Sequence, residues 1–179
     1  MPKFVTGSAA AVLFASVAAI ATAVPAAADN PTLLGVSKNW GAYTVGAGPD
    51  KVCYALSQPR ATSPKKAKRD PIFFLINDWP GRRARAEPEV VPGYKYKDGS
   101  PVTAEVSGFK YVFFTKNDGD AGSAWVKDVI DEQHLIDNMQ KGDELVITGT
   151  SARGTLTRDT YSLDGLSDAL TKIHTACNM

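Results

Sequence analysis

The chain has 179 residues, 44% of them hydrophobic, and its 20 lysines and arginines against 19 aspartates and glutamates give a formal net charge of +1. Such a balance gives no reason to expect a nucleic-acid partner. The length suits one domain with a substantial core and leaves no room for a second.

The first 28 residues have the pattern of a signal peptide. Lys3 provides a minimal basic start, residues 4–24 are rich in small and aliphatic side chains, and residues 26–28 are three alanines that suit cleavage. The apolar stretch approaches membrane-spanning length, but polar residues and a proline interrupt it, which favours a cleaved leader over a retained anchor. The sequence thus predicts a signal peptide over 1–28 and a mature domain over 29–179 that does not span a membrane. We expect a periplasmic or secreted protein, with outer-membrane association as an alternative.

The first part of the mature chain predicts strands and one long loop. Residues 39–45 and 52–57 carry aromatic and aliphatic side chains, and a Gly- and Pro-containing turn over 46–50 makes them a hairpin. Residues 60–70 are rich in lysine, arginine and proline, which predicts a surface loop. Residues 72–76 form a short apolar run typical of a buried strand.

The middle of the chain continues this strand pattern. A strand is expected to open at Val90 and Val91, residues 102–106 alternate apolar with polar side chains, and residues 109–115 are aromatic and aliphatic. Ser107 and Gly108 form the turn between the last two strands.

The last third of the chain contains the two predicted helices. Leu135, Ile136 and Met139 share one helical stripe, after acidic residues that suit a first turn and before a Lys-Gly stop. Residues 144–150 and 155–163 then form a threonine-rich hairpin. The chain ends in a helix with one apolar face and Ser162 or Asp164 as its cap; that face carries Leu166, Ala169, Leu170, Ile173 and Cys177.

These elements predict a mainly β fold. About eight short strands with close turns and only two helices, the second at the C-terminus, indicate an antiparallel β-sandwich with the helices packed at one side. A parallel α/β sheet is disfavoured because strands follow one another without intervening helices.

Cys53 and Cys177 remain after the predicted leader is removed. In an exported protein this leaves one possible intramolecular pair, so a disulfide between them is the default. A reactive thiol pair and an intermolecular bridge are the alternatives, although redox pairs usually lie close in sequence. The disulfide would hold the apolar face of the last helix on the sheet.

Charge is unevenly distributed along the chain. Residues 60–97 contain ten basic against four acidic side chains, whereas residues 117–144 contain eight acidic against two basic ones. A solvated loop is the plainer reading of the basic segment. The functional reading is docking onto anionic lipopolysaccharide, phospholipid head groups or an acidic protein. The candidate residues are Arg60, Lys65, Lys66, Lys68, Arg69, Arg82, Arg83 and Arg85. Trp79 is expected either as an interfacial anchor or as a core residue.

No other motif points to a reaction centre. His134 and His174 are both expected at the surface, and no nucleophile elbow or metalloprotease motif accompanies them. Residues 117–120 carry oxygen side chains but lack the spacing of a calcium loop, so a turn is expected. Residues 149–154 lack the Lys and helix of a phosphate-binding loop and are expected to form a hairpin tip. We predict no catalytic residue, metal or cofactor.

Several segments of the chain together resemble the invasion-associated locus B family. They are Gly93–Ser100, Phe113–Lys116 followed by Ala124–Val126, and above all Gly149–Thr155 with Asp159–Leu163. The similarity covers essentially the whole mature chain. It implies an exported, mostly β envelope protein of Gram-negative bacteria, in a family named for host-cell entry, and it brings no catalytic residue with it.

The leading hypothesis is therefore a non-enzymatic exported envelope protein whose loops mediate binding, with a role in host-cell interaction or envelope integrity. A second hypothesis is a periplasmic enzyme whose site is assembled from residues far apart in the sequence; a pocket with hydrogen-bonded Asp, Ser or His groups would favour it. A third is a chaperone-like module that uses exposed sheet edges or apolar patches.

Overall fold

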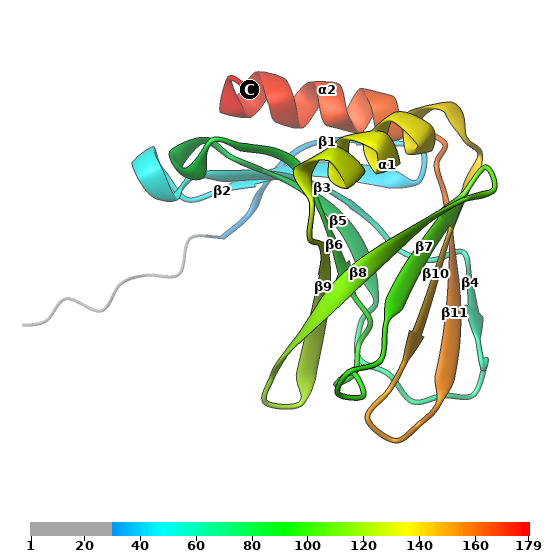
Figure 1. Ribbon diagram of the computed structural model, residues 1–179. Helices are drawn as coiled ribbons and strands as arrows, with labels where there is room; N and C mark the ends of the chain where they lie inside the picture. The colour runs from blue at the N-terminus through cyan, green and yellow to red at the C-terminus, as the bar shows by residue number, and fades with distance from the viewer. Residues whose placement is uncertain (1–29) are drawn as a thin grey trace, which may run out of the picture.

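The computed structural model describes residues 30–179 (Figure 1), so the predicted signal peptide lies outside the described residues. The strands are β1 (Thr32–Ser37), β2 (Trp40–Val45), β3 (Val52–Ser57), β4 (Ala61–Ser63), β5 (Phe73–Trp79), β6 (Ala84–Val91), β7 (Val102–Val106), β8 (Phe109–Asp118), β9 (Ala121–Val126), β10 (Glu144–Thr150) and β11 (Leu156–Ser162). The helices are α1 (Val129–Lys141) and α2 (Leu166–Cys177), with short 3-10 turns η1 (Gly48–Asp50) and η2 (Pro80–Arg82).

All the strands belong to one antiparallel sheet, in the order β1-β2-β3-β5-β6-β9-β8-β7-β10-β11-β4. The predicted mainly β, antiparallel fold with two helices is confirmed. The structure refines it, because residues 30–179 form eleven strands in one continuous sheet, rather than about eight. Figure 1 shows this sheet bending, so that β1 to β3 run beneath α2 while β7 to β11 descend at a steep angle to them.

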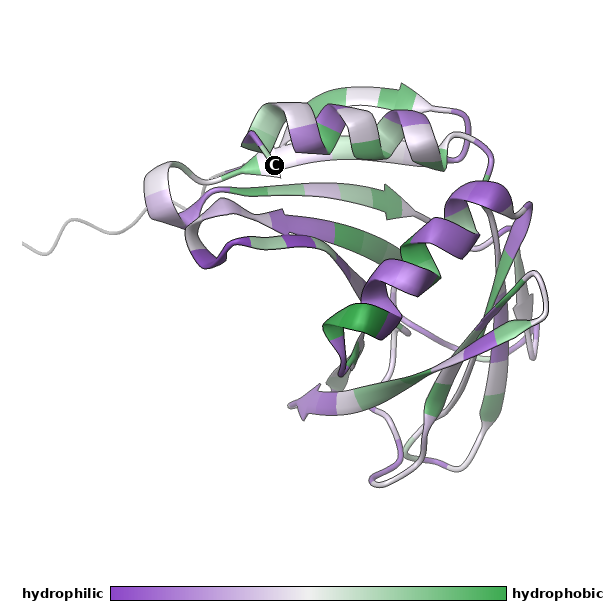
Figure 2. Cartoon of the chain, turned by 45° about the horizontal axis from the view of Figure 1, so that its top comes forward, coloured by the Kyte–Doolittle hydropathy of each residue, from purple (hydrophilic) through white to green (hydrophobic). Residues whose placement is uncertain are grey.

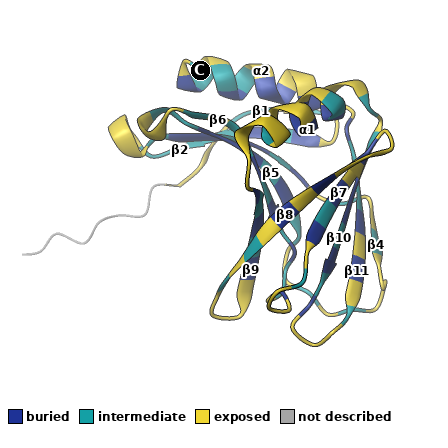
Figure 3. Cartoon of the chain, in the orientation of Figure 1, coloured by how far each residue is buried: buried dark blue, intermediate teal, exposed yellow. Residues whose placement is uncertain are grey.

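The bend brings the inner faces of distant strands together in the core (Figure 3). The rings of Phe74 on β5 and Tyr161 on β11 are 5.8 Å apart, although five strands separate β5 from β11 in the sheet. Trp40, fully buried, donates from Nε1 to the carbonyl of Ser162 at 3.0 Å. Because the indole donor is satisfied, Trp40 can be buried there without an unpaired polar group.

Helix α1 forms as its apolar stripe predicts, with Leu135, Ile136 and Met139 buried. Asp128 caps its N-terminus, because the Oδ1 of this residue accepts the backbone N–H of Ile130 at 2.8 Å. Figure 2 shows that the outward side of α1 is mostly hydrophilic, with hydrophobic residues at its start. The helix is therefore amphipathic, with its buried side toward the sheet.

Helix α2 buries the five residues of its predicted apolar face and packs across β1, β2 and β3. The predicted disulfide is confirmed, since Cys53 on β3 is bonded to Cys177 at the end of α2. The expected cap is wrong: Gly165, with a φ of 94°, caps the helix instead of Ser162 or Asp164. A Cβ at Gly165 would lie 2.0 Å from the Ser37 carbonyl oxygen, so this close approach requires glycine.

Neither helix within residues 30–179 combines the length and the hydropathy needed to cross a membrane.

Candidate functional site

A groove of about 780 Å³ opens between the two helices and the start of β6. One wall comes from η2 and the first residues of β6, which are Arg82 to Ala86. The second comes from α1 and the third from α2, which contributes His174. The floor is apolar where the buried Ile136 and Leu170 line it. A concave site that combines an apolar floor with charged walls is the usual setting for ligand binding.

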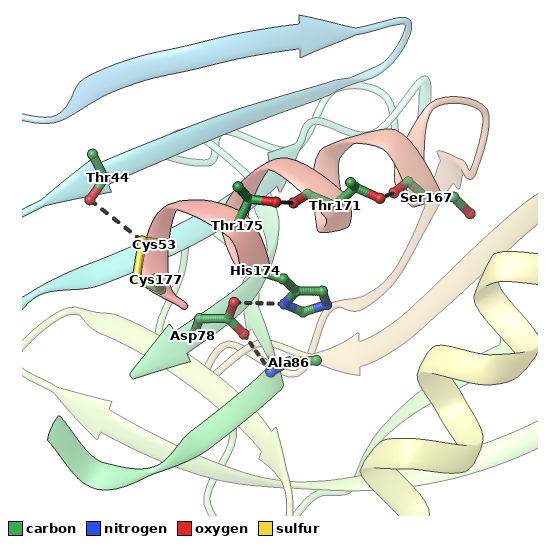
Figure 4. A network of polar contacts seen from close by, with 9 residues as sticks. All are labelled: Thr44, Cys53, Asp78, Ala86, Ser167, Thr171, His174, Thr175 and Cys177. Atoms are coloured by element: carbon green, nitrogen blue, oxygen red, sulfur yellow. Dashed lines mark hydrogen bonds and ion pairs between the residues drawn. A yellow bond between two sulfur atoms is a disulfide. The ribbon is translucent and has the colours of Figure 1, made fainter. Parts of the chain in front are cut away.

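A buried carboxylate holds two of these walls in place (Figure 4). Asp78 is 0% exposed, and its Oδ2 accepts from Nδ1 of His174 at 2.7 Å. Its Oδ1 accepts the backbone N–H of Ala86 at 2.9 Å. One side chain on β5 thus connects α2 to β6, and both of its oxygens have partners, as a buried carboxylate requires.

The wall formed by β6 has an irregular backbone. The pairing of β5 with β6 changes register between Asn77 and Trp79, opposite Ala84 to Glu87. Arg83 and Ala86 both adopt positive φ values, 55° and 56°, which are uncommon for residues with a Cβ. The hydrogen bond from Ala86 to Asp78 stabilises one of these two conformations. Such local strain often marks a site where side-chain direction matters.

The groove has walls of opposite charge. Arg82, Arg83 and Arg85 line the β6 side, whereas Glu132 and Asp137 line the α1 side. A part of the basic segment and a part of the acidic segment therefore face each other across the groove.

The acidic wall is partly shielded from water. Burial, together with the neighbouring carboxylates of Glu87 and Asp128, raises the pKa of Glu132 to about 7. Near neutral pH this wall therefore carries less negative charge than its composition suggests.

Trp79 and Arg82 form a stacked pair at the rim of the groove. The Arg82 guanidinium lies 4.0 Å from the centre of the Trp79 ring, and Glu87 accepts a hydrogen bond from Trp79 Nε1 at 2.8 Å. Trp79 is half-buried, so it is neither a fully exposed interfacial anchor nor a fully buried core residue. Arg82 also forms an ion pair with Glu87 at 3.5 Å, whereas Arg83 and Arg85 form no ion pair within residues 30–179.

The basic residues grouped by the sequence do not form one cluster. Lys65, Lys66 and Lys68 are exposed on the predicted loop, which also contains β4 at the far end of the sheet from η2. Arg60 precedes β4 and pairs with Glu144, and both side chains are exposed. The loop cations therefore lie apart from the three arginines of the groove.

Arg69 is the residue of the candidate cluster whose placement departs most from expectation. Its guanidinium makes two hydrogen bonds to Asp159, at 2.7 and 2.6 Å, and its Nε donates to the Pro92 carbonyl at 2.9 Å. The side chains of Arg69 and Asp159 are only 5% and 3% exposed. The expectation of a solvated loop residue is wrong for Arg69, because it fastens the loop onto β11.

The two histidines also differ. His134 is exposed as expected, but the expectation that His174 is a surface residue is wrong, since its side chain is only 17% exposed and is bonded to Asp78. Two signals were available in the sequence. His174 lies one helical turn before Cys177, and the polar pair Asn77-Asp78 interrupts the end of a buried strand. Neither pattern alone indicates that His174 and Asp78 bond to each other.

The remaining motifs have the expected local structures. Residues 117–120 end β8 and turn the chain into β9, and Asn117 uses its side chain to accept the N–H of Tyr96 at 2.9 Å. Residues 149–154 form the tip between β10 and β11. Among residues 30–179, no group of three or more His, Cys, Asp or Glu side chains is arranged to hold a metal ion.

The hydroxyl groups near His174 are directed to the helix backbone. Thr171 Oγ1 donates to the Ser167 carbonyl at 2.9 Å, and Thr175 Oγ1 donates to the Thr171 carbonyl at 2.7 Å (Figure 4). In the structure His174 bonds to a carboxylate but not to a hydroxyl nucleophile. The groove is thus equipped to bind charged and apolar groups, with an imidazole at one wall.

The chain is similar to one protein family and to one solved structure. The family model described as "Invasion associated locus B (IalB) protein" matches residues 40–174. The solved structure titled "Crystal structure of invasion associated protein b from bartonella henselae" aligns with a TM-score of 0.56 and 13% sequence identity, over 81% of this chain and 98% of that chain. At that identity the likeness shows the fold alone. No curated protein matches the chain.

Proposed function

The chain belongs to the invasion associated locus B family, and from this premise we propose that it is an exported, non-enzymatic binding protein of the bacterial envelope. Its groove receives an anionic group of the partner, and phosphate groups of lipopolysaccharide or phospholipid are the chemistry that fits best. The protein acts in the periplasm or after secretion. This proposal leaves host-cell contact and envelope integrity as the two settings in which such binding would matter.

The observation that carries the proposal is the state of the arginines in the groove. Arg83 and Arg85 are exposed and line its wall, and no acidic side chain within residues 30–179 forms an ion pair with either. In contrast, Arg60 and Arg69 already have carboxylate partners. Arginine binds phosphate through paired, charge-assisted hydrogen bonds, so unpaired arginines beside a concave surface favour an anionic ligand.

The neighbouring groups fit the same ligand. The apolar side chains that line the groove, among them the exposed Val129, can accept the aliphatic part of an amphiphile. The raised pKa of Glu132 reduces the repulsion that an ionised acidic wall would exert on an anion. Binding through exposed cations should weaken as salt screens the charges.

The experiment is a binding titration with two vesicle compositions, phosphatidylcholine alone and phosphatidylcholine with phosphatidylglycerol, and with lipopolysaccharide micelles as a third probe. The test variant is Arg83→Ala/Arg85→Ala. The matched control is Lys65→Ala/Lys66→Ala/Lys68→Ala, which removes cations from the loop instead.

We expect binding to anionic surfaces only, with a large loss of affinity in the arginine variant and a smaller one in the lysine variant. Phosphatidylglycerol and lipopolysaccharide differ as sources of phosphate, so their relative affinities identify the envelope component. Unchanged binding by the arginine variant, or a greater loss in the lysine variant, would contradict the groove as the binding site.

A second candidate function is favoured by the hydrogen bond between Asp78 and His174. A buried carboxylate that orients an imidazole beside a pocket is an arrangement used in general acid–base catalysis. The groove would then hold a substrate rather than a ligand. A screen with chromogenic ester, phosphate and glycoside substrates tests this candidate, with His174→Ala as the reference. Turnover that disappears in the variant would favour catalysis, and turnover no greater than that of the variant would favour binding alone.

A further inference from the structure

The two end strands of the sheet differ in how they are protected. At one end, β4 has only three residues and is followed by Pro64, which has no N–H, and by the lysines of the loop. Short length, proline and lysine are the usual means by which proteins prevent a sheet edge from pairing with another chain. The edge at β4 is therefore blocked.

The edge at the other end is longer, and it is flanked by one proline, Pro31, and one lysine, Lys38. Strand β1 spans six residues, Thr-Leu-Leu-Gly-Val-Ser, with no charged residue and no proline. Within residues 30–179 it pairs only with β2, with a register shift between Leu33 and Gly35, so one side of its backbone has no described strand beside it (Figure 1). An uncharged open edge of this length is a template for another strand.

The side chains of β1 divide between its two faces. Leu34 packs on the core beneath α2, and Lys172 of α2 donates to the Ser37 hydroxyl at 3.0 Å. Leu33 and Val36 are 54% and 65% exposed. They pair with residues two positions apart on β2, Tyr43 and Gly41, which places both on the outer face.

The outer face next to β1 is aromatic. Leu33 lies opposite Tyr43, which lies opposite Tyr54, and the two tyrosine rings stack at 5.2 Å. This row of apolar and aromatic side chains ends at β1, where the backbone is also unpaired. A strand added there would extend both the hydrogen bonding and the apolar row.

We propose that β1 pairs with β1 of a second copy of this chain, antiparallel and about a two-fold axis. In such an isologous contact each copy contributes the same edge, and an uncharged strand brings no like charges together. The exposed Leu33 and Val36 of one copy then continue the row of apolar and aromatic side chains on the outer face of the other copy. Because the opposite edge at β4 is blocked, association stops at a dimer and does not proceed to a filament.

The proposal does not depend on the groove, because none of the groove residues lies on β1. The experiment is sedimentation equilibrium of the purified protein over a range of concentrations. The test variant is Leu33→Lys/Val36→Lys, and the control is Leu156→Lys, which places one lysine at a similarly exposed leucine (66%) on β11. All three sites are exposed, so the fold should tolerate the changes.

We expect a monomer–dimer equilibrium in the unmodified protein. The double variant should weaken it about tenfold or more, because it opposes like charges across the strand pair, whereas the control should not change it. Hydrogen exchange requires no variant and locates the contact, since amides of residues 32–37 should become more protected as concentration rises. A monomer at every concentration, a dimer unaffected by the double variant, or protection confined to other segments would overturn the proposal.

Discussion

Two buried aspartates each hold one region of this molecule together, one around Arg69 and the other around His174, and the two aspartates have different partners. Asp159, on β11, is paired with Arg69, whose guanidinium is buried and always charged. Asp78, on β5, is paired with His174, whose imidazole is partly exposed and lines the groove. Each carboxylate is almost inaccessible, at 2% and 0% exposure.

The Arg69–Asp159 pair is a structural contact, whereas the His174–Asp78 pair belongs to the candidate site. Arg69 uses its donors on Asp159 and Pro92, and its guanidinium also lies 5.0 Å from the centre of the Tyr94 ring, so this side chain is engaged within the protein. His174 uses one nitrogen on Asp78 and remains at the wall of a cavity. A basic residue is thus a candidate for partner binding only where the fold leaves its donors free.

The largest loss of stability is expected from removing the disulfide between Cys53 and Cys177, which lies in the His174 region. Replacing Cys53 and Cys177 by alanine should lower the free energy of unfolding by about 4–5 kcal/mol at most, because the disulfide closes a separation of 124 residues. The loss should free the end of α2, three residues from His174, while the Arg69 region stays intact. Urea unfolding, with hydrogen exchange to locate the loosened segment, checks this. Loosening at Asp159 first would contradict it.

The next effect tests the fully buried pair directly. Arg69→Met leaves Asp159 buried without a cation and should cost about 3–5 kcal/mol of stability. Arg60→Met removes the same guanidinium from an exposed pair with Glu144 and should cost about 1 kcal/mol or less. Urea unfolding of both variants gives the comparison. Equal losses would show that Arg69 is not the anchor of its loop.

A smaller loss of stability is expected when Asp78 loses its bond to His174. His174→Ala should cost about 1.5–3 kcal/mol, because the charge-assisted hydrogen bond is lost while Asp78 keeps the Ala86 N–H. His134→Ala on the exposed face of α1 is the control and should change stability by about 0.5 kcal/mol at most. Thermal unfolding of the two variants measures the difference. A His174 variant as stable as the His134 variant would remove the pair as an organising contact.

The smallest effect concerns the acidic wall of the groove and appears as pH dependence. The pKa of Glu132 is raised from 4.5 to about 7, so the folded state holds this proton where the unfolded chain has released it. Its contribution to stability is therefore present at low pH and is lost as pH rises through about 4.5 to 7.

Glu132→Gln should remove that loss and leave a flatter pH profile. Melting temperatures at about pH 5 and about pH 8 should show the variant gaining on the unmodified protein only at the higher value. The groups that face Glu132 are Glu87, Asp128 and the arginines of the groove, and they are unchanged in the variant. Parallel profiles for the two proteins would contradict the assigned pKa.

Much of the fold could be predicted from the sequence because it depends on local pattern. The stripe of α1, the apolar face of α2 and the hairpin of β2 and β3 follow from side-chain periodicity and turn residues. The disulfide followed from counting, since only two cysteines remain outside the predicted leader. Three strands escaped prediction. Two of them, β1 and β4, lie at the ends of the sheet, where one edge is exposed and the pattern is weak, and the third, β9, is an inner strand that begins with small residues. The expectation that a strand opens at Val90 and Val91 is also wrong, because these residues end β6.

The candidate site was less predictable because it depends on pairs distant in the chain. Arg69 and Asp159 are 90 positions apart, and Asp78 and His174 are 96 apart. Nothing in the local sequence distinguishes Arg69 from Lys68, yet one is buried and the other exposed. The sequence did identify the basic and acidic segments, but their arrangement as opposite walls of one groove results from where the sheet bends.

The central claim is that the arginine wall of the groove, and not the lysine loop, meets the anionic partner. The most direct measurement is mapping of backbone amide shifts by NMR as short-chain phosphatidylglycerol is added to the purified protein. We expect shifts at Arg83 to Ala86, along the facing side of α1 and at His174. Shifts confined to Lys65, Lys66 and Lys68 would contradict it.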